Sequence, residues 1–168
     1  MTIQDILSAL EAVAPPQLQE SYDNAGLIVG DPQATLNGVL FCLDSTEAVV
    51  DEAVRLGCNL IVAHHPIVFK GLKRLNGSTY IERTVIKAVR ENVAIYAIHT
   101  NLDNVHRQGV NAKIAEKIGL HNTRILSPKP GTAMDIGAGL VGQLIQPMDE
   151  TAFLLHVKKV MQTNCVRH

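Results

Sequence analysis

The stretch Asn59-Leu60-Ile61-Val62-Ala63-His64-His65-Pro66 decides which fold this chain can adopt. Its first part is a short apolar run rich in β-branched residues, which is typical of a buried strand. Two adjacent histidines follow, and Pro66 then ends the strand because proline lacks the N–H group that a sheet needs. Ligands bind at the carboxyl ends of strands in open α/β sheets, so His64 and His65 are predicted to face a ligand.

Similar apolar runs at residues 39–43 and 93–98 predict two more strands. The run at 39–43 is continuous, which favours a central strand covered on both faces. Helical spacing of apolar residues predicts amphipathic helices after three possible N-caps: Thr2, a residue of the stretch Asp44-Ser45-Thr46, and Ser78. The alternation predicts an α/β class, with a layered fold in which helices flank a mixed, largely parallel sheet.

The composition changes after residue 127. A connector rich in proline is followed by a glycine-rich stretch at 137–144, which predicts a further strand, and by a predicted helix at 149–162. We therefore predict two parts: residues 1–127 as an N-terminal half that carries a metal site, and residues 128–168 as a connector with the incomplete start of a C-terminal half. A helix in a βα repeat should lead to another strand, so we expect the polypeptide to be a fragment.

The composition limits the class of protein. Of the 168 residues, 46% are hydrophobic and 18% are charged, which indicates a globular chain rather than a disordered one. The net charge of -1 gives no strong signal for a nucleic-acid partner. No stretch has the length of a membrane span and the N-terminus lacks a secretory signal, so we expect a cytoplasmic protein without a membrane partner. Three cysteines without a Cys-x-x-Cys pair favour reduced thiols.

Polar residues gather at the three predicted strand ends: Asp44 with Ser45 and Thr46, then His64 with His65, then His99 with Thr100 and Asp103. A carboxylate beside imidazoles suits a divalent transition metal. Asp103 is expected either to bridge two ions or to cap a helix or turn. His99 is expected to orient a ligand or to carry a proton.

The histidine pair taken alone has a plainer interpretation, in which one ring is buried and hydrogen-bonded and its neighbour is exposed. Adjacent strand residues point to opposite faces of a sheet. Both rings would therefore meet one site only if the chain bends at Pro66, or if two ions lie side by side.

Three motifs in this order resemble the NIF-three-like family, whose members are often labelled GTP cyclohydrolase I type 2. The motifs are Tyr22-Asp23-Asn24-Ala25-Gly26-Leu27-Ile28-Val29-Gly30, His64-His65-Pro66 and His99-Thr100-Asn101-Leu102-Asp103. The resemblance covers residues 1 to about 127 and resumes at Gly137. It implies an α/β fold with two similar halves and a toroidal homohexamer whose metals face its interior. It also implies a dinuclear metal centre with His64, His65 and Asp103 as metal ligands.

This sequence departs from the family pattern near its end. Family members complete the site with a C-terminal His-x-x-x-Glu, whereas His156 is followed four residues later by Val160 and His168 is the last residue. We therefore expect weak metal occupancy, or fewer than two ions per chain, together with association into oligomers. The extra domain that many relatives carry before the glycine-rich stretch is absent, because Pro130 is close to Gly137.

The expected function is that of a metal-dependent hydrolase acting on a nucleotide or another heterocyclic small molecule. The resemblance implies two divalent ions per complete subunit, and the residues do not distinguish Zn, Fe, Mn and Ni. His99 is the predicted catalytic residue as a proton carrier, while Lys70 or Arg74 is expected to meet an anionic group. The alternative is a non-catalytic protein: a metal-binding scaffold, a metal chaperone or an interaction protein.

Overall fold

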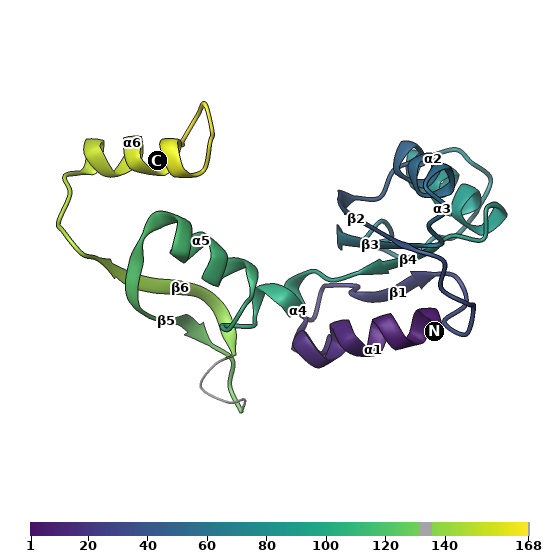
Figure 1. Cartoon of the computed structure of the whole chain (residues 1–168), viewed down its shortest axis with the longest axis horizontal. Helices are drawn as coiled ribbons and strands as arrows, with labels where there is room; N and C mark the ends of the chain where they lie inside the picture. The colour runs from purple at the N-terminus through teal and green to yellow at the C-terminus, as the bar shows by residue number, and fades with distance from the viewer. Residues whose placement is uncertain (132–135, 168) are drawn as a thin grey trace. The chain divides into compact units, whose positions relative to one another are not determined.

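A computed structural model describes residues 1–131 and 136–167 of the chain (Figure 1). The chain divides into two compact units, Met1–Leu102 and Asp103–His168, so the division falls before the sequence-based boundary at residue 127. Thr132 of the predicted connector and His168 lie outside the described residues. None of the helices in the described ranges is long and apolar enough to cross a membrane.

A four-stranded sheet with the order β1-β4-β3-β2 forms the centre of the first unit. Strands β2 (Val39–Asp44), β3 (Leu60–His65) and β4 (Ala94–Ala97) are parallel to one another. Strand β1 (Gly26–Val29) pairs with β4 in the antiparallel direction. The predicted α/β class with a mixed, largely parallel sheet is therefore confirmed.

Helices cover both faces of this sheet (Figure 1). Ile61 and Ala63 of β3 belong to the core cluster that also contains buried residues of α2 (Glu47–Arg55) and α3 (Tyr80–Arg90). Leu60 and Val62 belong to the cluster that contains Ile3 and Leu7 of α1 (Ile3–Val13). Because successive strand residues point to opposite faces, a strand buried on both sides needs an unbroken apolar run, as residues 60–63 provide.

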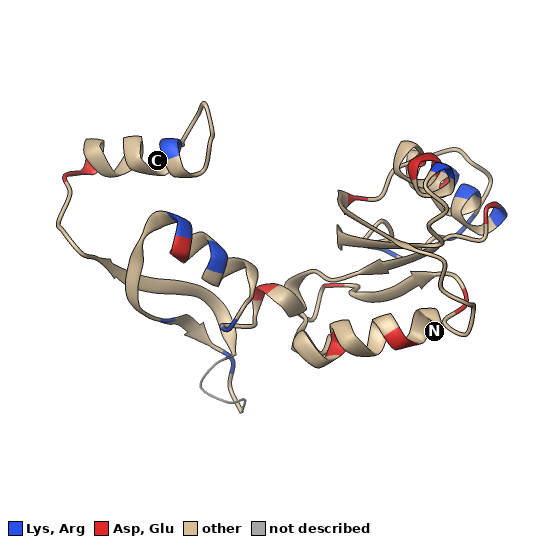
Figure 2. Cartoon of the chain, in the orientation of Figure 1, with Lys and Arg blue, Asp and Glu red and all other residues tan. Residues whose placement is uncertain are grey.

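The first unit also contains the short 3-10 helix η1 (Pro16–Leu18), which follows α1. On the outer surface, the helices α2 and α3 carry acidic and basic residues intermixed (Figure 2). Arg83 pairs with Glu47 at 3.0 Å and Lys87 with Asp51 at 2.5 Å. Such exposed ion pairs contribute little to stability, on the order of 0–1 kcal/mol each.

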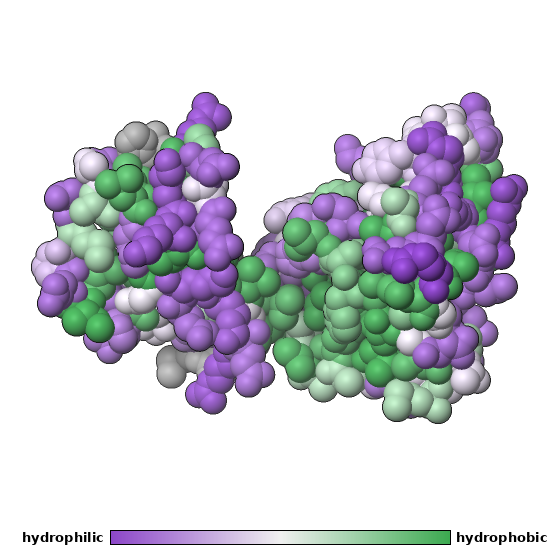
Figure 3. Space-filling view, turned by 45° about the horizontal axis from the view of Figure 1, so that its top comes forward, coloured by the Kyte–Doolittle hydropathy of each residue, from purple (hydrophilic) through white to green (hydrophobic). Residues whose placement is uncertain are grey.

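The prediction that β2 is a central strand covered on both faces is wrong. Among the described strands β2 pairs only with β3, so it lies at the edge of the sheet. Phe41 and Leu43 are 68% and 66% exposed. An apolar run at a sheet edge looks the same in sequence as one in the centre, because neighbouring strands are a tertiary property. Figure 3 shows apolar side chains gathered on one face of this unit.

The start of α3 also differs from the prediction of Ser78 as its N-cap. Thr79 is the N-cap residue, and its hydroxyl accepts a hydrogen bond from the Glu82 N–H. The Ser78 hydroxyl instead donates to the Glu82 carboxylate at 2.9 Å. Hydrogen bonds from Ser78, Thr79 and the backbone of Asn76 to this carboxylate, the Ser78 hydroxyl bond first among them, hold the pKa of Glu82 below its usual value.

The second unit contains the antiparallel strands β5 (Leu120–Pro128) and β6 (Gly137–Leu144) with helices α5 (Val110–Ile118) and α6 (Glu150–Val160). The strand at 137–144 and the helix within 149–162 were predicted. Strand β5 was missed because its sequence is mostly polar and Ile125 is its one buried residue. The short helix α4 (Thr100–Asp103) spans the division between the units.

Gly30 provides a test of the close packing between β1 and the start of β4. Its φ of +108° is unfavourable for other residues, and a Cβ would lie 2.6 Å from the Ala94 Cβ. We expect Gly30→Ala to lower the free energy of unfolding by about 1–3 kcal/mol, measured by urea denaturation. Gly71→Ala is the matched control, because a Cβ there meets nothing within 4 Å. Equal unfolding midpoints for the two variants would contradict the packing described.

Candidate metal centre

Three histidines meet at the carboxyl ends of two neighbouring strands. His64 and His65 are the last residues of β3, and His99 follows β4. The ring centroids are 4.9 Å apart for His64 and His65, 5.2 Å for His64 and His99, and 5.6 Å for His65 and His99. Each ring offers a nitrogen that lies within 4.8 Å of the other two. The rings of the two adjacent histidines therefore lie at one site, although neighbouring residues of a regular strand point to opposite faces of the sheet.

His64 is oriented by the backbone of the neighbouring strand. Its Nδ1 lies 2.9 Å from the carbonyl oxygen of Ile98, the residue after β4. A carbonyl oxygen only accepts hydrogen bonds, so Nδ1 carries the proton in the neutral ring. The lone pair of this imidazole is consequently on Nε2, where it is available to a metal ion.

His65 is oriented by a carboxylate on β2. Its Nδ1 donates to Oδ1 of Asp44 at 2.8 Å. The two residues are register partners in the parallel pair of β2 and β3, so the sheet itself brings them together. Both side chains are solvent-accessible, at 48% for His65 and 67% for Asp44.

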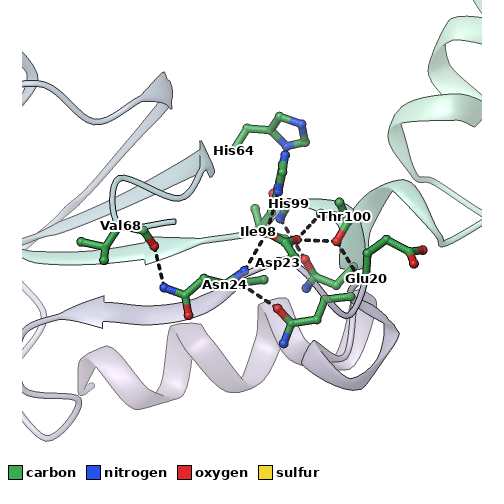
Figure 4. A network of polar contacts seen from close by, with 11 residues as sticks. Glu20, Asp23, Asn24, His64, Val68, Ile98, His99 and Thr100 are labelled. Atoms are coloured by element: carbon green, nitrogen blue, oxygen red, sulfur yellow. Dashed lines mark hydrogen bonds and ion pairs between the residues drawn. The ribbon is translucent and has the colours of Figure 1, made fainter. Parts of the chain in front are cut away.

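His99 is oriented by Asp23, which the sequence predicted only as part of a turn before β1. The His99 Nδ1 donates to Oδ1 of Asp23 at 2.8 Å (Figure 4). The Asp23 side chain is fully buried, and it also accepts hydrogen bonds from the backbone N–H and the hydroxyl of Thr100 and from the N–H of Asn24. Burial by itself raises the pKa of Asp23, but these hydrogen bonds outweigh it and lower the pKa below its usual value.

Asn101 fixes the turn that carries His99. Its Oδ1 accepts a hydrogen bond from the His99 N–H at 2.8 Å, and its Nδ2 donates to the Ala14 carbonyl at 2.7 Å. The residue is fully buried. Asn101 therefore holds the backbone at the base of the cluster and connects it to the end of α1.

The cluster has the chemistry that a divalent transition metal needs. In each ring Nδ1 donates to a fixed acceptor, which leaves Nε2 as the free ligand atom. Histidines that bind metals almost always donate their other N–H to a carboxylate or a backbone carbonyl. Imidazole suits Zn, Cu, Fe and Ni. The described residues fit a metal ion here, and a hollow of about 300 Å³ beside His65, lined in part by Thr46 and Tyr80, provides space for a small ligand.

Asp103 is the last residue of α4 and the first residue of the second unit. Its backbone carbonyl accepts a hydrogen bond from Nδ2 of Asn111 at 2.9 Å. Its assignment as a metal ligand and the assignment of His99 as the catalytic residue stay predictions. In the second unit His156 has a structural contact, because its Nε2 lies 2.8 Å from the Ile118 carbonyl oxygen.

Sequence reasoning missed Asp23 as a partner of the cluster. Asp44 was placed at the correct strand end, but its pairing with His65 was not predicted. The sequence feature that could have pointed to Asp23 is its place in the motif Tyr22-Asp23-Asn24, although this motif lies far from His99 in sequence. The feature that could have pointed to the contact between Asp44 and His65 is the parallel register of the two apolar runs that these residues end.

The chain matches the model of the Duf34/NIF3 (NGG1p interacting factor 3) family over residues 1–168. A GTP cyclohydrolase 1 type 2 homolog of Clostridium acetobutylicum is 33% identical over 168 residues, which cover 100% of this chain and 62% of that protein. A homolog with the same description from Staphylococcus epidermidis is 39% identical over 127 residues, or 76% of this chain and 34% of that protein. The chain thus spans less than two thirds of the length of these relatives.

Solved structures agree with the sequence relatives. A hypothetical protein of Staphylococcus aureus superposes with a TM-score of 0.90 at 28% identity, over 99% of this chain and 66% of that chain. A Bacillus cereus protein related to NIF3 superposes with a TM-score of 0.72 at 40% identity, over 77% of this chain and 36% of that chain. With the motif order, the sheet and the family match in agreement, the chain belongs to the DUF34/NIF3 family.

Proposed function

We propose that this chain forms the metal-binding part of a metal-dependent hydrolase that acts on a nucleotide or another heterocyclic small molecule. The observation that carries the proposal is the arrangement of the three histidines, each with Nδ1 donating to a fixed acceptor and Nε2 free. A site built only for stability would not need three neighbouring imidazoles with unpaired lone pairs. Solvent access at His65 gives a substrate a route to the cluster.

The residues of the cluster have separate roles in this proposal. His64 and His65 hold the metal through Nε2, and Asp44 keeps His65 in the required tautomer. His99 moves a proton at Nε2, while buried Asp23 holds its ring in place and stabilises the charged form that arises when the ring accepts a proton. A bound divalent ion would supply Lewis acidity and lower the pKa of water. In the complete protein we propose two ions per subunit, with Asp103 as a further ligand.

The substrate class is supported by the relatives and by one loop of this chain. The relatives are described as GTP cyclohydrolase 1 type 2 homologs, and a purine nucleotide is therefore the first substrate to test. Lys70 and Arg74 lie in an exposed loop that follows β3, where they are available to an anionic group.

For the complete protein we propose a toroidal homohexamer. The exposed apolar side chains of Phe41 and Leu43 support this proposal, because they would be buried by contact with another protein subunit.

Turnover distinguishes a hydrolase from a metal-binding scaffold. The protein is loaded with Zn²⁺, Mn²⁺, Fe²⁺ or Ni²⁺ and incubated with a panel of nucleotides that includes GTP, with product formation followed by chromatography. We expect metal-dependent turnover that falls about 10²–10⁴-fold in His99→Gln, because the proton carrier is lost. Retained metal without turnover of any nucleotide, in this chain and in a full-length relative, would favour the scaffold.

Metal binding itself is tested on the histidine pair. We expect Zn²⁺ to stabilise the parent protein by about 2.7 kcal/mol at a hundredfold excess over its dissociation constant. His64→Ala and His65→Ala should lose most of this stabilisation and most of the bound metal, measured by thermal melts and elemental analysis. The exposed His121 provides the control variant His121→Ala. Unchanged metal content in both cluster variants would defeat the assignment, and Asp103→Asn in the same titration tests the proposed further ligand.

Asp44→Asn isolates the contribution of the carboxylate behind His65. The amide removes the negative charge and offers an N–H group to the ring, so it no longer selects the tautomer with a free Nε2. We expect metal affinity to weaken about 10–100-fold, measured by competition with a chromogenic chelator. Asp51→Asn is the control, since Asp51 is similarly exposed and pairs with Lys87 away from the histidines. Equal affinities in the two variants would show that Asp44 does not tune the site.

A further inference from the structure

Two exposed aromatic side chains lie beside the histidine cluster. The Phe69 ring centroid is 6.3 Å from that of His99, with the rings nearly perpendicular at 79°. The Tyr22 ring centroid is 6.4 Å from that of Phe69, and the two planes differ by 33°. Tyr22 is 64% exposed and Phe69 is 45% exposed. Neither ring belongs to a core cluster, so packing of the unit does not account for them.

The two rings are held in place by the segments that orient His99. Nδ2 of Asn24 donates to the Val68 carbonyl at 2.6 Å, which joins the segment before β1 to the loop after β3 (Figure 4). Tyr22 directly precedes Asp23, the partner of His99, and Phe69 directly follows Val68. The backbone segments that carry the aromatic pair are therefore tied to each other and to the partner of His99.

We propose that Tyr22 and Phe69 form a stacking surface for the planar heterocyclic ring of the substrate, and this inference rests on the proposed function. Aromatic side chains stack on the π-face of any nucleobase, and this contact leaves the edge of the base uncovered. A ring stacked on Phe69 lies beside His99, because the centroids of the two side-chain rings are 6.3 Å apart. The surface positions the reacting edge of the heterocycle without binding the metal.

The loop that carries Phe69 determines which heterocycles fit. Lys70, Lys73 and Arg74 are all exposed, and residues 66–79 contain no aspartate or glutamate. A local excess of positive charge attracts phosphate groups. The ligand class is therefore a heterocycle with phosphates, in which Phe69 and Tyr22 contact the ring and the basic residues contact the anionic tail.

GTP and tripolyphosphate are the two probes of this surface, because they share the anionic tail and only GTP has a ring. Calorimetric titration of the parent, with and without Zn²⁺, should give tighter binding of GTP than of tripolyphosphate. We expect Phe69→Leu and Tyr22→Leu to weaken GTP binding about tenfold and to leave tripolyphosphate binding and metal content unchanged. Phe69→Tyr retains the π-face and should bind GTP like the parent. Leu75→Ala is the control, since Leu75 is 58% exposed in the same loop and offers no aromatic face.

The outcomes separate this inference from the proposed function. Unchanged GTP affinity in both leucine variants, or no measurable GTP binding by the parent, overturns the stacking surface while leaving the metal site intact. A change in oligomeric state by light scattering in the leucine variants, without a change in GTP affinity, shows that the rings contact protein and also overturns it. A parent protein that binds no metal, but binds GTP more tightly than Phe69→Leu does, instead overturns the proposed function and supports the stacking surface.

Discussion

The hydrogen bond between Nδ1 of each clustered histidine and a fixed acceptor is the interaction on which the site depends. The acceptors are the Ile98 carbonyl, the Asp44 carboxylate and the Asp23 carboxylate. They lie after β4, at the end of β2 and before β1, so all three exist only when the sheet is assembled. Folding of the first unit and orientation of the ligand atoms are therefore one event, and a variant that disturbs strand register should also disturb the cluster.

Asp23 has a larger structural role than the other acceptors. Its buried carboxylate accepts hydrogen bonds from His99, Thr100 and Asn24, and the Thr100 hydroxyl accepts one from the Glu20 N–H. A buried carboxylate is costly unless hydrogen bonds compensate its lost hydration. The lowered pKa indicates that they do so here. Asp23 consequently joins the segment before β1 to the start of α4 and orients a site residue with the same contacts.

The sequence predicted the fold class and the position of the histidines for physical reasons that the structure bears out. Apolar runs that are buried on both faces identify β3 and β4, and a proline after β3 identifies its end. The partners of the histidines were not predictable in the same way, because Asp23 and His99 meet only through the antiparallel pairing of β1 with β4. The edge position of β2 was missed because its composition is that of a central strand.

The charges around the cluster differ on its two sides. Three neutral imidazoles bring no charge to a cation, so the attraction comes from the carboxylates behind His65 and His99. Asp44 is exposed, and its field is reduced by water and by salt, whereas Asp23 is buried and is screened much less. The side of the cluster formed by Asp23 and His99 therefore keeps its attraction for a divalent ion at high ionic strength, while the side formed by Asp44 and His65 weakens. Solvent also reaches the two sides unequally, because the His65 side chain is 48% exposed and that of His99 is 19% exposed.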